Sequence, residues 1–406
     1  MTSDRSLVPR HTGHWFEVFR VFLRLGLTSF GGPIAHLGYF REEIVTRRKW
    51  LDDRAYADLV ALCQFLPGPA SSQVGIAIGL TRAGYGGALA AWMGFTLPSA
   101  VAMIVFAYWV GSLGDISSVG WIHGLKVAAV AVVAQAVLGM ARTLAPDRPR
   151  ATLAVAAAGI ALAFPTAAGQ IGAILLGAAC GFILPRPAMP TDHASLPLRI
   201  GRRAGFAFLM LFFVLLAGTP LLLAAVPSHG LAVFEAFYRA GALIFGGGHV
   251  ILPLLQASVV SPGWVSNDSF LAGYGAAQAI PGPLSTFAAY LGANMGSQPN
   301  GWTGALLCLV AVFLPSFLLV LGALPFWEDV RRRPVAQAAL RGVNAAVVGL
   351  LLAAFYNPVW TAGIRNAGDF VLAAIAFLLL FLWRTPPWAV VAISAAGGAL
   401  LALPIT

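Results

Sequence analysis

Two short segments of this chain combine glutamine, proline, glycine and hydroxyl residues in an order that suits the binding of an anion. In each segment a glutamine precedes Pro-Gly-Pro, and a hydroxyl residue follows. The members are Gln64, Pro67, Gly68, Pro69, Ser71 and Ser72 in the first segment, and Gln278, Pro281, Gly282, Pro283, Ser285 and Thr286 in the second. A helix that restarts after such a break exposes unpaired N–H groups and a partial positive charge of roughly half a unit. Nearby amides and hydroxyls would add hydrogen bonds to an oxyanion.

A glycine-rich turn precedes each of these segments and belongs to the same predicted site. The turns and the histidines that follow them are Gly31, Gly32, Pro33 and His36 in the first case, and Gly246, Gly247, Gly248 and His249 in the second. Glycine allows two backbones to approach closely, and a neutral imidazole donates one hydrogen bond. Each histidine either couples transport to protons or makes a local structural bond.

Lys126 is a charged candidate inside an apolar run, and Asn344 occupies its matching place later in the chain. Its amine either holds the charge of the substrate or extends to the membrane surface. The alternative reading of the two Pro-Gly-Pro segments is that they only kink helices and help them pack. Three separated cysteines, without CxxC or matching histidine spacing, predict neither a metal site nor a cofactor.

Composition sets the environment in which these residues act. Of 406 residues, 59% are hydrophobic and 10% are charged, against about 25% charged in a typical soluble domain. This excludes a water-soluble globule, and apolar runs long enough to cross about 30 Å of hydrocarbon recur along the chain. The net charge of +10 comes from short loops, where it indicates topology rather than nucleic-acid binding. The sequence predicts an all-α polytopic membrane protein whose partners are the lipid bilayer and a small oxyanion.

The chain contains an internal repeat. Phe30-Gly31-Gly32 recurs as Phe245-Gly246-Gly247, and Leu97-Pro98-Ser99 recurs as Leu314-Pro315-Ser316, with the other motifs also offset by about 214 to 218 residues. Such self-similarity indicates two copies of one unit. We divide the chain into a cytoplasmic tail (1–14), a first transporter repeat (15–184), a basic linker with one transmembrane helix (185–231) and a second repeat (232–406).

Loop charges predict that the two repeats have inverted topology. The loop at 41–54 carries five basic residues, and its counterpart at 254–268 carries none. The asymmetry then reverses, because 111–120 has no basic residue whereas Arg331 to Arg333 are consecutive arginines. Since basic loops stay in the cytoplasm, equivalent loops face opposite sides. We expect a cytoplasmic N-terminus and an external C-terminus.

The opening segments of each repeat are too short or too interrupted to be simple crossings. A helix over 16–30 would rise only about 22 Å at 1.5 Å per residue, and 56–82 contains the first Pro-Gly-Pro. We predict re-entrant or broken helical hairpins, followed by crossings at 88–110, 121–140, 151–164 and 169–184. In the alternative topology the broken segments cross the membrane completely, which gives about thirteen transmembrane segments.

The motifs themselves resemble the chromate ion transporter family in its long two-domain form. The resemblance rests on Phe30 to His36, Trp50, Gln64 to Pro69 and Gln278 to Pro283, and it extends over both halves. It implies a bacterial-type inner-membrane transporter that expels chromate, can handle sulfate and confers chromate resistance. One departure is Gly248-His249 where the first half has Pro33-Ile34, which argues against equal roles for the two hairpins.

The expected function is secondary export of an oxyanion, chromate or also sulfate, by alternating access at a midplane site. No GxxxxGK[ST] run is present, so nucleotide hydrolysis is not expected and the protein is not predicted to be an enzyme. The alternatives are a passive anion channel, a sulfate-type importer and, remotely, an intramembrane enzyme. A homodimer is one possible assembly.

Overall fold

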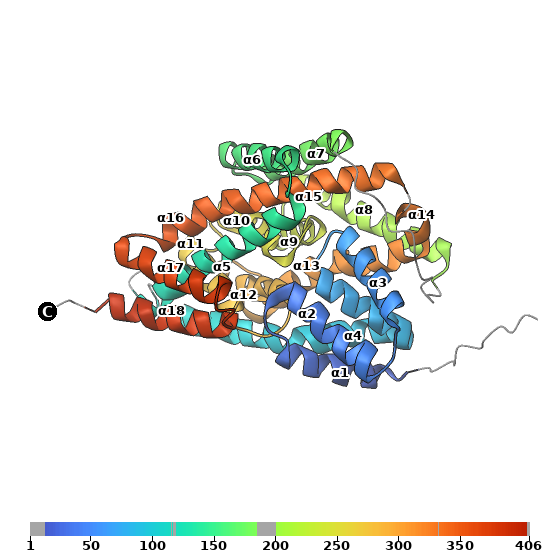
Figure 1. Cartoon of the computed structure of the whole chain (residues 1–406), viewed down its shortest axis with the longest axis horizontal. Coiled ribbons are helices and arrows are strands. Elements are labelled where there is room, and N and C mark those ends of the chain that lie inside the picture. The colour runs from blue at the N-terminus through green and yellow to red at the C-terminus, as the bar shows by residue number, and fades with distance from the viewer. Residues whose placement is uncertain (1–12, 115, 117–118, 185–199, 332, 404–406) are drawn as a thin grey trace, which may run out of the picture.

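The computed structural model describes residues 13–114, 116, 119–184, 200–331 and 333–403 (Figure 1). Every regular element in these ranges is a helix, so the predicted all-α class is confirmed. The predicted cytoplasmic tail, except for its last two residues, lies outside the described residues. So does most of the basic linker.

Several helices of the first half begin at side-chain caps. They are α1 (Trp15–Thr28), α2 (Gly32–Phe40) with a π-helical extension (Arg41–Arg47), α3 (Asp53–Phe65), α4 (Ala70–Ser112), α5 (Gly120–Leu144), α6 (Arg148–Ala163) and α7 (Ala167–Cys180). Asp52 and Asp147 accept hydrogen bonds from N–H groups three residues later and so cap α3 and α6. Pro33 lies in the first turn of α2, where a missing N–H costs nothing.

The second half follows a single linking helix, α8 (Arg202–Ala225). Its helices are α9 (His229–Ala242), α10 (Ile251–Val259), α11 (Asn267–Ala277), α12 (Phe287–Asn294), α13 (Gly301–Ala323), α14 (Trp327–Arg331), α15 (Pro334–Ala354), α16 (Thr361–Gly363), α17 (Ala367–Phe381) and α18 (Pro387–Leu401). Short 3₁₀ turns at Gly248–Val250 and Leu284–Thr286 lead into α10 and α12.

Five helical runs are long and apolar enough to cross a membrane. They are α4, α5, α8, Gly301–Phe326 and Pro334–Gly363. Of the most apolar stretch of α8 only 11% is buried, against 72% for Gly301–Phe326, so α8 lies at the periphery and faces lipid. The predicted crossings at 151–164 and 169–184 correspond to α6 and α7. These have 16 and 14 residues and rise only about 24 and 21 Å, so their status as full crossings stays a prediction.

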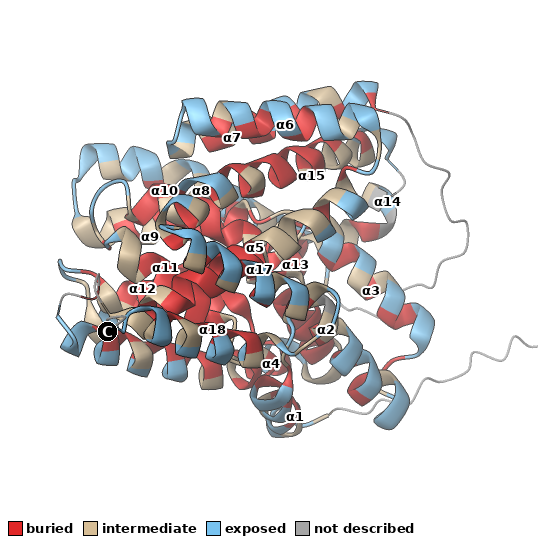
Figure 2. Ribbon diagram, turned by 60° about the vertical axis from the view of Figure 1, so that its left-hand side comes forward, coloured by how far each residue is buried: buried red, intermediate tan, exposed pale blue. Residues whose placement is uncertain are grey.

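Equivalent helices of the two halves pack against the opposite half in a reciprocal way. Helix α5 of the first half lies against α17 and α18 of the second, and α15 of the second half lies against α6 and α7 of the first. Figure 1 shows α6 and α7 along one edge over α15, and α17 and α18 beside α5. Small residues permit the close approach: a side chain on Gly124 would meet the Ser394 carbonyl, and one on Gly342 would meet the Gly177 carbonyl. Buried residues gather between these layers (Figure 2).

Helix α4 contains the one large internal bend of the first half's described helices. At Ala83 and Gly84 the backbone leaves the helical region, with φ of 64° at Gly84. Gly79 and Gly87 on either side contact each other so closely that neither has room for a side chain. In the second half the matching region is a true gap, between the end of α12 at Asn294 and the start of α13 at Gly301. A chain turn therefore follows the broken helix in both halves.

Candidate functional site

Both predicted breaks are present, and each separates two helices at the expected glycine. Helix α3 ends at Phe65 and α4 begins at Ala70, while α11 ends at Ala277 and a 3₁₀ turn resumes at Leu284. Gly68 has φ of 129° and Gly282 has φ of 104°, backbone conformations that other residues adopt only at a cost of about 1–3 kcal/mol. The glycines are thus required by the geometry of the break itself.

The breaks are joined across the two halves by a reciprocal pair of backbone hydrogen bonds. The Gly68 N–H donates to the Ile244 carbonyl at 2.7 Å, and the Gly282 N–H donates to the Ser29 carbonyl at 3.0 Å. Ser29 and Ile244 occupy the same place at the end of the first helix in each half, directly before Phe-Gly-Gly. Each half therefore supplies the acceptor for the break of the other. We call the region around these two bonds the junction.

Two further serines, Ser99 and Ser316, also lie at the junction. In the sequence they stand out only as members of the repeated Leu-Pro-Ser motif. A methyl group on Gly68 would lie 2.8 Å from the Ser316 Oγ, and one on Gly282 would lie 2.7 Å from the Ser99 Oγ. Ser99 follows Leu-Pro on α4, and Ser316 follows Leu-Pro on α13. The signal that could have identified them was their presence at matched positions of both copies.

Hydroxyl groups at the junction are buried, and several have no partner. Among the described residues, the nearly fully buried hydroxyl oxygens without a partner include those of Ser29, Ser72, Ser285 and Ser316. Thr286 instead donates to the Pro283 carbonyl at 2.9 Å, and Ser71 lies 3.4 Å from His36 Nδ1. A buried hydroxyl without a partner costs free energy that a bound ligand can recover. The predicted set thus splits into groups that are satisfied within the protein and groups open to a ligand.

The glutamines of the two breaks are not equivalent. Gln64 is exposed, whereas Gln278 is half-buried and its side chain lies at the Tyr274 hydroxyl, one helical turn earlier. Gln73, which sequence reasoning missed, is fully buried and donates to the Pro67 carbonyl at 2.7 Å. It thereby satisfies a carbonyl that the first break would leave unpaired. No local pattern distinguishes it from other residues of an apolar helix.

The glycine turns also meet, but their histidines have different surroundings. Pro33 Cγ lies 3.3 Å from where a methyl group on Gly248 would be. His36 is buried with its ring edge-on to Phe95, and His249 Nδ1 lies 2.8 Å from the Tyr274 hydroxyl. Each histidine therefore has a polar neighbour, closest at His249, and coupling of transport to protons stays a prediction.

Gly31, Gly32, Gly246 and Gly247 all adopt positive φ angles. The turns that they form are consequently positions where glycine is needed for the backbone as well as for close approach.

Lys126 is not brought to the breaks. Its Nζ lies 2.6 Å from Asp268 Oδ1, and Asp268 lies in the first turn of α11, at the end opposite Gln278. Ten residues of helix separate the two along α11, or about 15 Å. The neighbouring residue pair His123 and Asp369, whose Nε2 and Oδ1 are 2.9 Å apart, likewise joins α5 to the second half.

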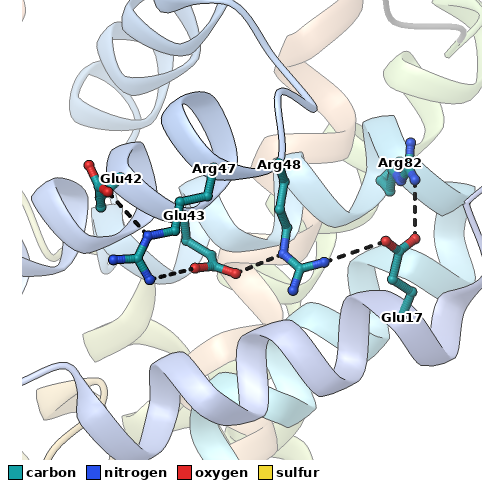
Figure 3. A network of polar contacts seen from close by, with 6 residues as sticks. All are labelled: Glu17, Glu42, Glu43, Arg47, Arg48 and Arg82. Carbon is teal, nitrogen blue, oxygen red and sulfur yellow. Dashed lines mark hydrogen bonds and ion pairs between the residues drawn. The ribbon is translucent and has the colours of Figure 1, made fainter.

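A chain of ion pairs links the π-helical turn after α2 to α1 and α4 (Figure 3). The contacts run from Glu42 through Arg47, Glu43, Arg48 and Glu17 to Arg82. Glu42 and Glu43 thus pair with arginines of their own basic loop. Glu43 is the most buried of the set, and the π-helical turn that carries it brings α2 against α1 and α4.

The fold is that of an all-α, multi-pass membrane protein whose buried polar groups gather where broken helices meet. Comparison of sequences then places it more narrowly. The family model for the chromate transporter matches twice, at residues 16–182 and 231–399. The chain belongs to the chromate transporter family.

Two curated relatives match nearly the whole chain and are named for chromate transport. A chromate transport protein of Pseudomonas aeruginosa is 28% identical over 94% of this chain and 90% of its own length. A probable chromate transport protein of Synechococcus elongatus is 26% identical over 87% of each. An uncharacterized transporter of Bacillus subtilis is 31% identical over 38% of this chain but 87% of its own length. No solved structure matches the chain.

Proposed function

We propose that the protein is a secondary transporter that exports chromate, and also accepts sulfate, across the inner membrane by alternating access at the junction. The observation that carries this proposal is the reciprocal Gly68–Ile244 and Gly282–Ser29 pairing beside unpartnered buried hydroxyls. The names of the long relatives support chromate as the substrate.

The junction suits an anion for electrostatic reasons. Helix α4 starts at the first break, and a 3₁₀ turn leading into α12 starts at the second, so free N–H groups of two first turns face this region. Unpartnered hydroxyls of Ser72 and Ser285 lie in these same turns. An anion is stabilised by both, and no cofactor is required for such binding.

Export needs no nucleotide hydrolysis if the membrane potential drives it. Moving one charge through 100 mV is worth about 2.3 kcal/mol, so a dianion leaving a cell held at about 100 mV negative inside gains roughly 4.6 kcal/mol. At 1.4 kcal/mol for each factor of ten, this supports a gradient of somewhat more than about a thousandfold. In this proposal the N-terminus is cytoplasmic and the C-terminus is external.

Flux into and out of liposomes tests the proposal. Purified protein is reconstituted, and labelled chromate and sulfate are followed under an imposed potential, with Gln64→Ala and Gln278→Ala alongside. We expect chromate flux that follows the potential, with Gln278→Ala more impaired than Gln64→Ala because Gln278 is half-buried beside the second break whereas Gln64 is exposed. If only sulfate were transported, the proposed substrate would be sulfate and not chromate. If neither anion were transported, the proposal would be refuted.

Two further readouts distinguish the remaining alternatives. Single-channel recording identifies a passive channel by conductance far above a transporter's rate.

Replacing Ser71 or Ser285 by alanine tests the hydroxyl contacts. We expect Ser285→Ala to reduce flux more, because the Ser71 hydroxyl already has His36 as a partner whereas that of Ser285 has none. Equal, wild-type kinetics in both variants would refute a role for these hydroxyls.

A further inference from the structure

Two arginines, Arg20 and Arg24, lie one helical turn apart on the exposed face of α1. The face of α1 that packs against α4 is apolar and includes Phe22 and Leu25. Among the described residues, neither arginine has an ion-pair partner. The exposed face therefore carries two positive charges that the protein itself does not neutralise.

The position of α1 beside α4 indicates how deep these arginines lie in the membrane. A methyl group on Gly94 of α4 would lie 2.8 Å from the Leu23 backbone nitrogen, so Arg24 is level with Gly94. The part of α4 from Tyr85 to Ser112 is about 42 Å long, against about 30 Å of hydrocarbon. When this part of α4 is centred in the bilayer, Gly94 lies about 14 Å beyond Tyr85. The Arg24 backbone is then about 8 Å inside the hydrocarbon.

The side chains of both arginines can return toward the headgroups. Side chains on a helix lean toward its N-terminus, which for α1 is the end near the ion pairs of Glu17. Arg20 shows this direction, because its Cζ lies 5.0 Å from the centre of the Phe16 ring, one turn earlier. Exposed Phe16 and Leu27 lie on either side of the arginine pair, so apolar side chains flank the two charges. Such an arrangement is typical of arginine that extends from hydrocarbon to the membrane surface.

The second half treats the matching positions differently. Glu235 and Arg239 of α9 stand where Arg20 and Arg24 stand in α1. Arg239 Nε lies 2.6 Å from Glu235 Oε1, and both side chains are mostly buried. The charge is thus neutralised within α9, whereas α1 needs an anion from outside the described residues.

A second copy of the chain offers little to fill this need. Exposed carboxylates on the described surface are already paired with arginines or cap a helix: Glu42, Asp53 and Asp329 are paired, and Asp52 caps α3. The anion that is abundant at this depth is the phosphate group of a phospholipid. Two guanidinium groups one turn apart can each bind a phosphate through two parallel hydrogen bonds.

We propose that Arg20 and Arg24 form a headgroup site that binds the phosphate of an anionic phospholipid, with its acyl chains along α1 beside Phe16 and Leu27. The site lies on the face of α1 opposite α4 and is separate from the junction. A zwitterionic phospholipid binds more weakly, because its own ammonium group already compensates its phosphate. Lipid binding is measured without any transported anion, so this inference goes beyond the proposed function and does not depend on it.

Lipid titration of the full chain in micelles of a neutral detergent tests the site. Apparent affinities for phosphatidylglycerol and phosphatidylcholine are obtained from the rise in thermal midpoint with lipid concentration. We expect the wild type to bind phosphatidylglycerol about tenfold more tightly than phosphatidylcholine. The double variant Arg20→Gln, Arg24→Gln should bind the two lipids within about twofold of each other.

The matched control is the double variant Arg54→Gln, Arg203→Gln. These arginines are also exposed, each lies in the first turn of a helix, and their replacement removes the same charge. The control should keep the tenfold preference.

Arg20→Glu keeps the test decisive if the double variant does not fold. A glutamate at this position can pair with Arg24 four residues later, as Glu235 pairs with Arg239 in α9. The change should therefore leave α1 folded while removing the preference for phosphatidylglycerol.

Each result supports or overturns the headgroup site. Equal affinity of the wild type for both lipids would overturn it, and so would loss of the preference in the Arg54 and Arg203 variant, because any positive surface would then suffice. Displacement of phosphatidylglycerol by inorganic phosphate at equal concentration would assign the arginines to a free anion and also overturn it. Selective lipid binding by a wild type that transports no anion would overturn the proposed function alone.

Discussion

The ion pair between Lys126 and Asp268 joins the two halves, and its removal can distinguish a structural lysine from one that holds the substrate. The Lys126 side chain is 1% exposed and that of Asp268 is 31% exposed, with Nζ and Oδ1 2.6 Å apart. The perturbations are Lys126→Met, Asp268→Asn and the double variant. Methionine keeps most of the lysine's volume, and asparagine keeps the shape of the carboxylate, so packing changes are small.

The unequal burial of the two groups predicts unequal costs. At an effective dielectric constant of about 20, two charges 2.6 Å apart attract by ~6 kcal/mol, but desolvation of the amine offsets much of this. Asp268→Asn leaves a buried ammonium without its counter-ion and should cost about 3 kcal/mol. Lys126→Met leaves a carboxylate that water partly reaches, and should cost about 1 kcal/mol. The double variant should cost about 1 kcal/mol, less than the sum.

Equilibrium unfolding in mixed micelles measures the free energy of unfolding of the three variants, and anion flux in liposomes measures their transport. We expect flux per folded protein to survive in the double variant, because the lysine is engaged about 15 Å from the break. If Asp268→Asn were no less stable than Lys126→Met, the burial argument would be wrong. If Lys126→Met and the double variant folded normally but carried no anion, the amine would be a substrate ligand.

Three further changes have definite expected outcomes. Gly68→Ala should cost about 2–4 kcal/mol in the same unfolding assay and abolish flux, because its methyl would meet Ser316, whereas Gly38→Ala in α2, with open space around it, should be neutral within about 0.5 kcal/mol. Glu43→Gln should lower the thermal midpoint and make it less sensitive to salt, since two arginines share this carboxylate. Hydrogen bonds from Arg150 lower the pKa of Asp147, so wild type should exceed Asp147→Asn in stability at neutral pH, with the difference lost as pH falls below about 4.

The predicted breaks were accessible from sequence because proline and glycine act locally. Pro-Gly-Pro ends a helix wherever it occurs, and its recurrence at Pro281 to Pro283 marked it as a feature of the architecture. The ends of α1 and α3 fall within a few residues of the expected positions for the same reason. Re-entrant geometry and inverted topology stay predictions, since they depend on where the membrane lies.

The partners of the polar residues could not be predicted, because they lie far away in the chain. Asp268 is 142 residues from Lys126, and an acidic residue in a loop gives no sign of a buried amine. Tyr274 reads as one more core aromatic until its distance to His249 is known. Likewise, only the folded arrangement shows that Gln278 is half-buried while Gln64 is exposed.

The reciprocal junction also constrains how the chain is made. When the first half leaves the ribosome, the Gly68 N–H has no acceptor until Ile244 is synthesised roughly 175 residues later, which takes about 9–35 s at about 5–20 residues per second. An unpaired N–H in a lipid environment costs several kcal/mol. Water or another protein must therefore satisfy the nascent half during this interval. A chain of half this length that carried one such break would have to find its acceptor in a second chain.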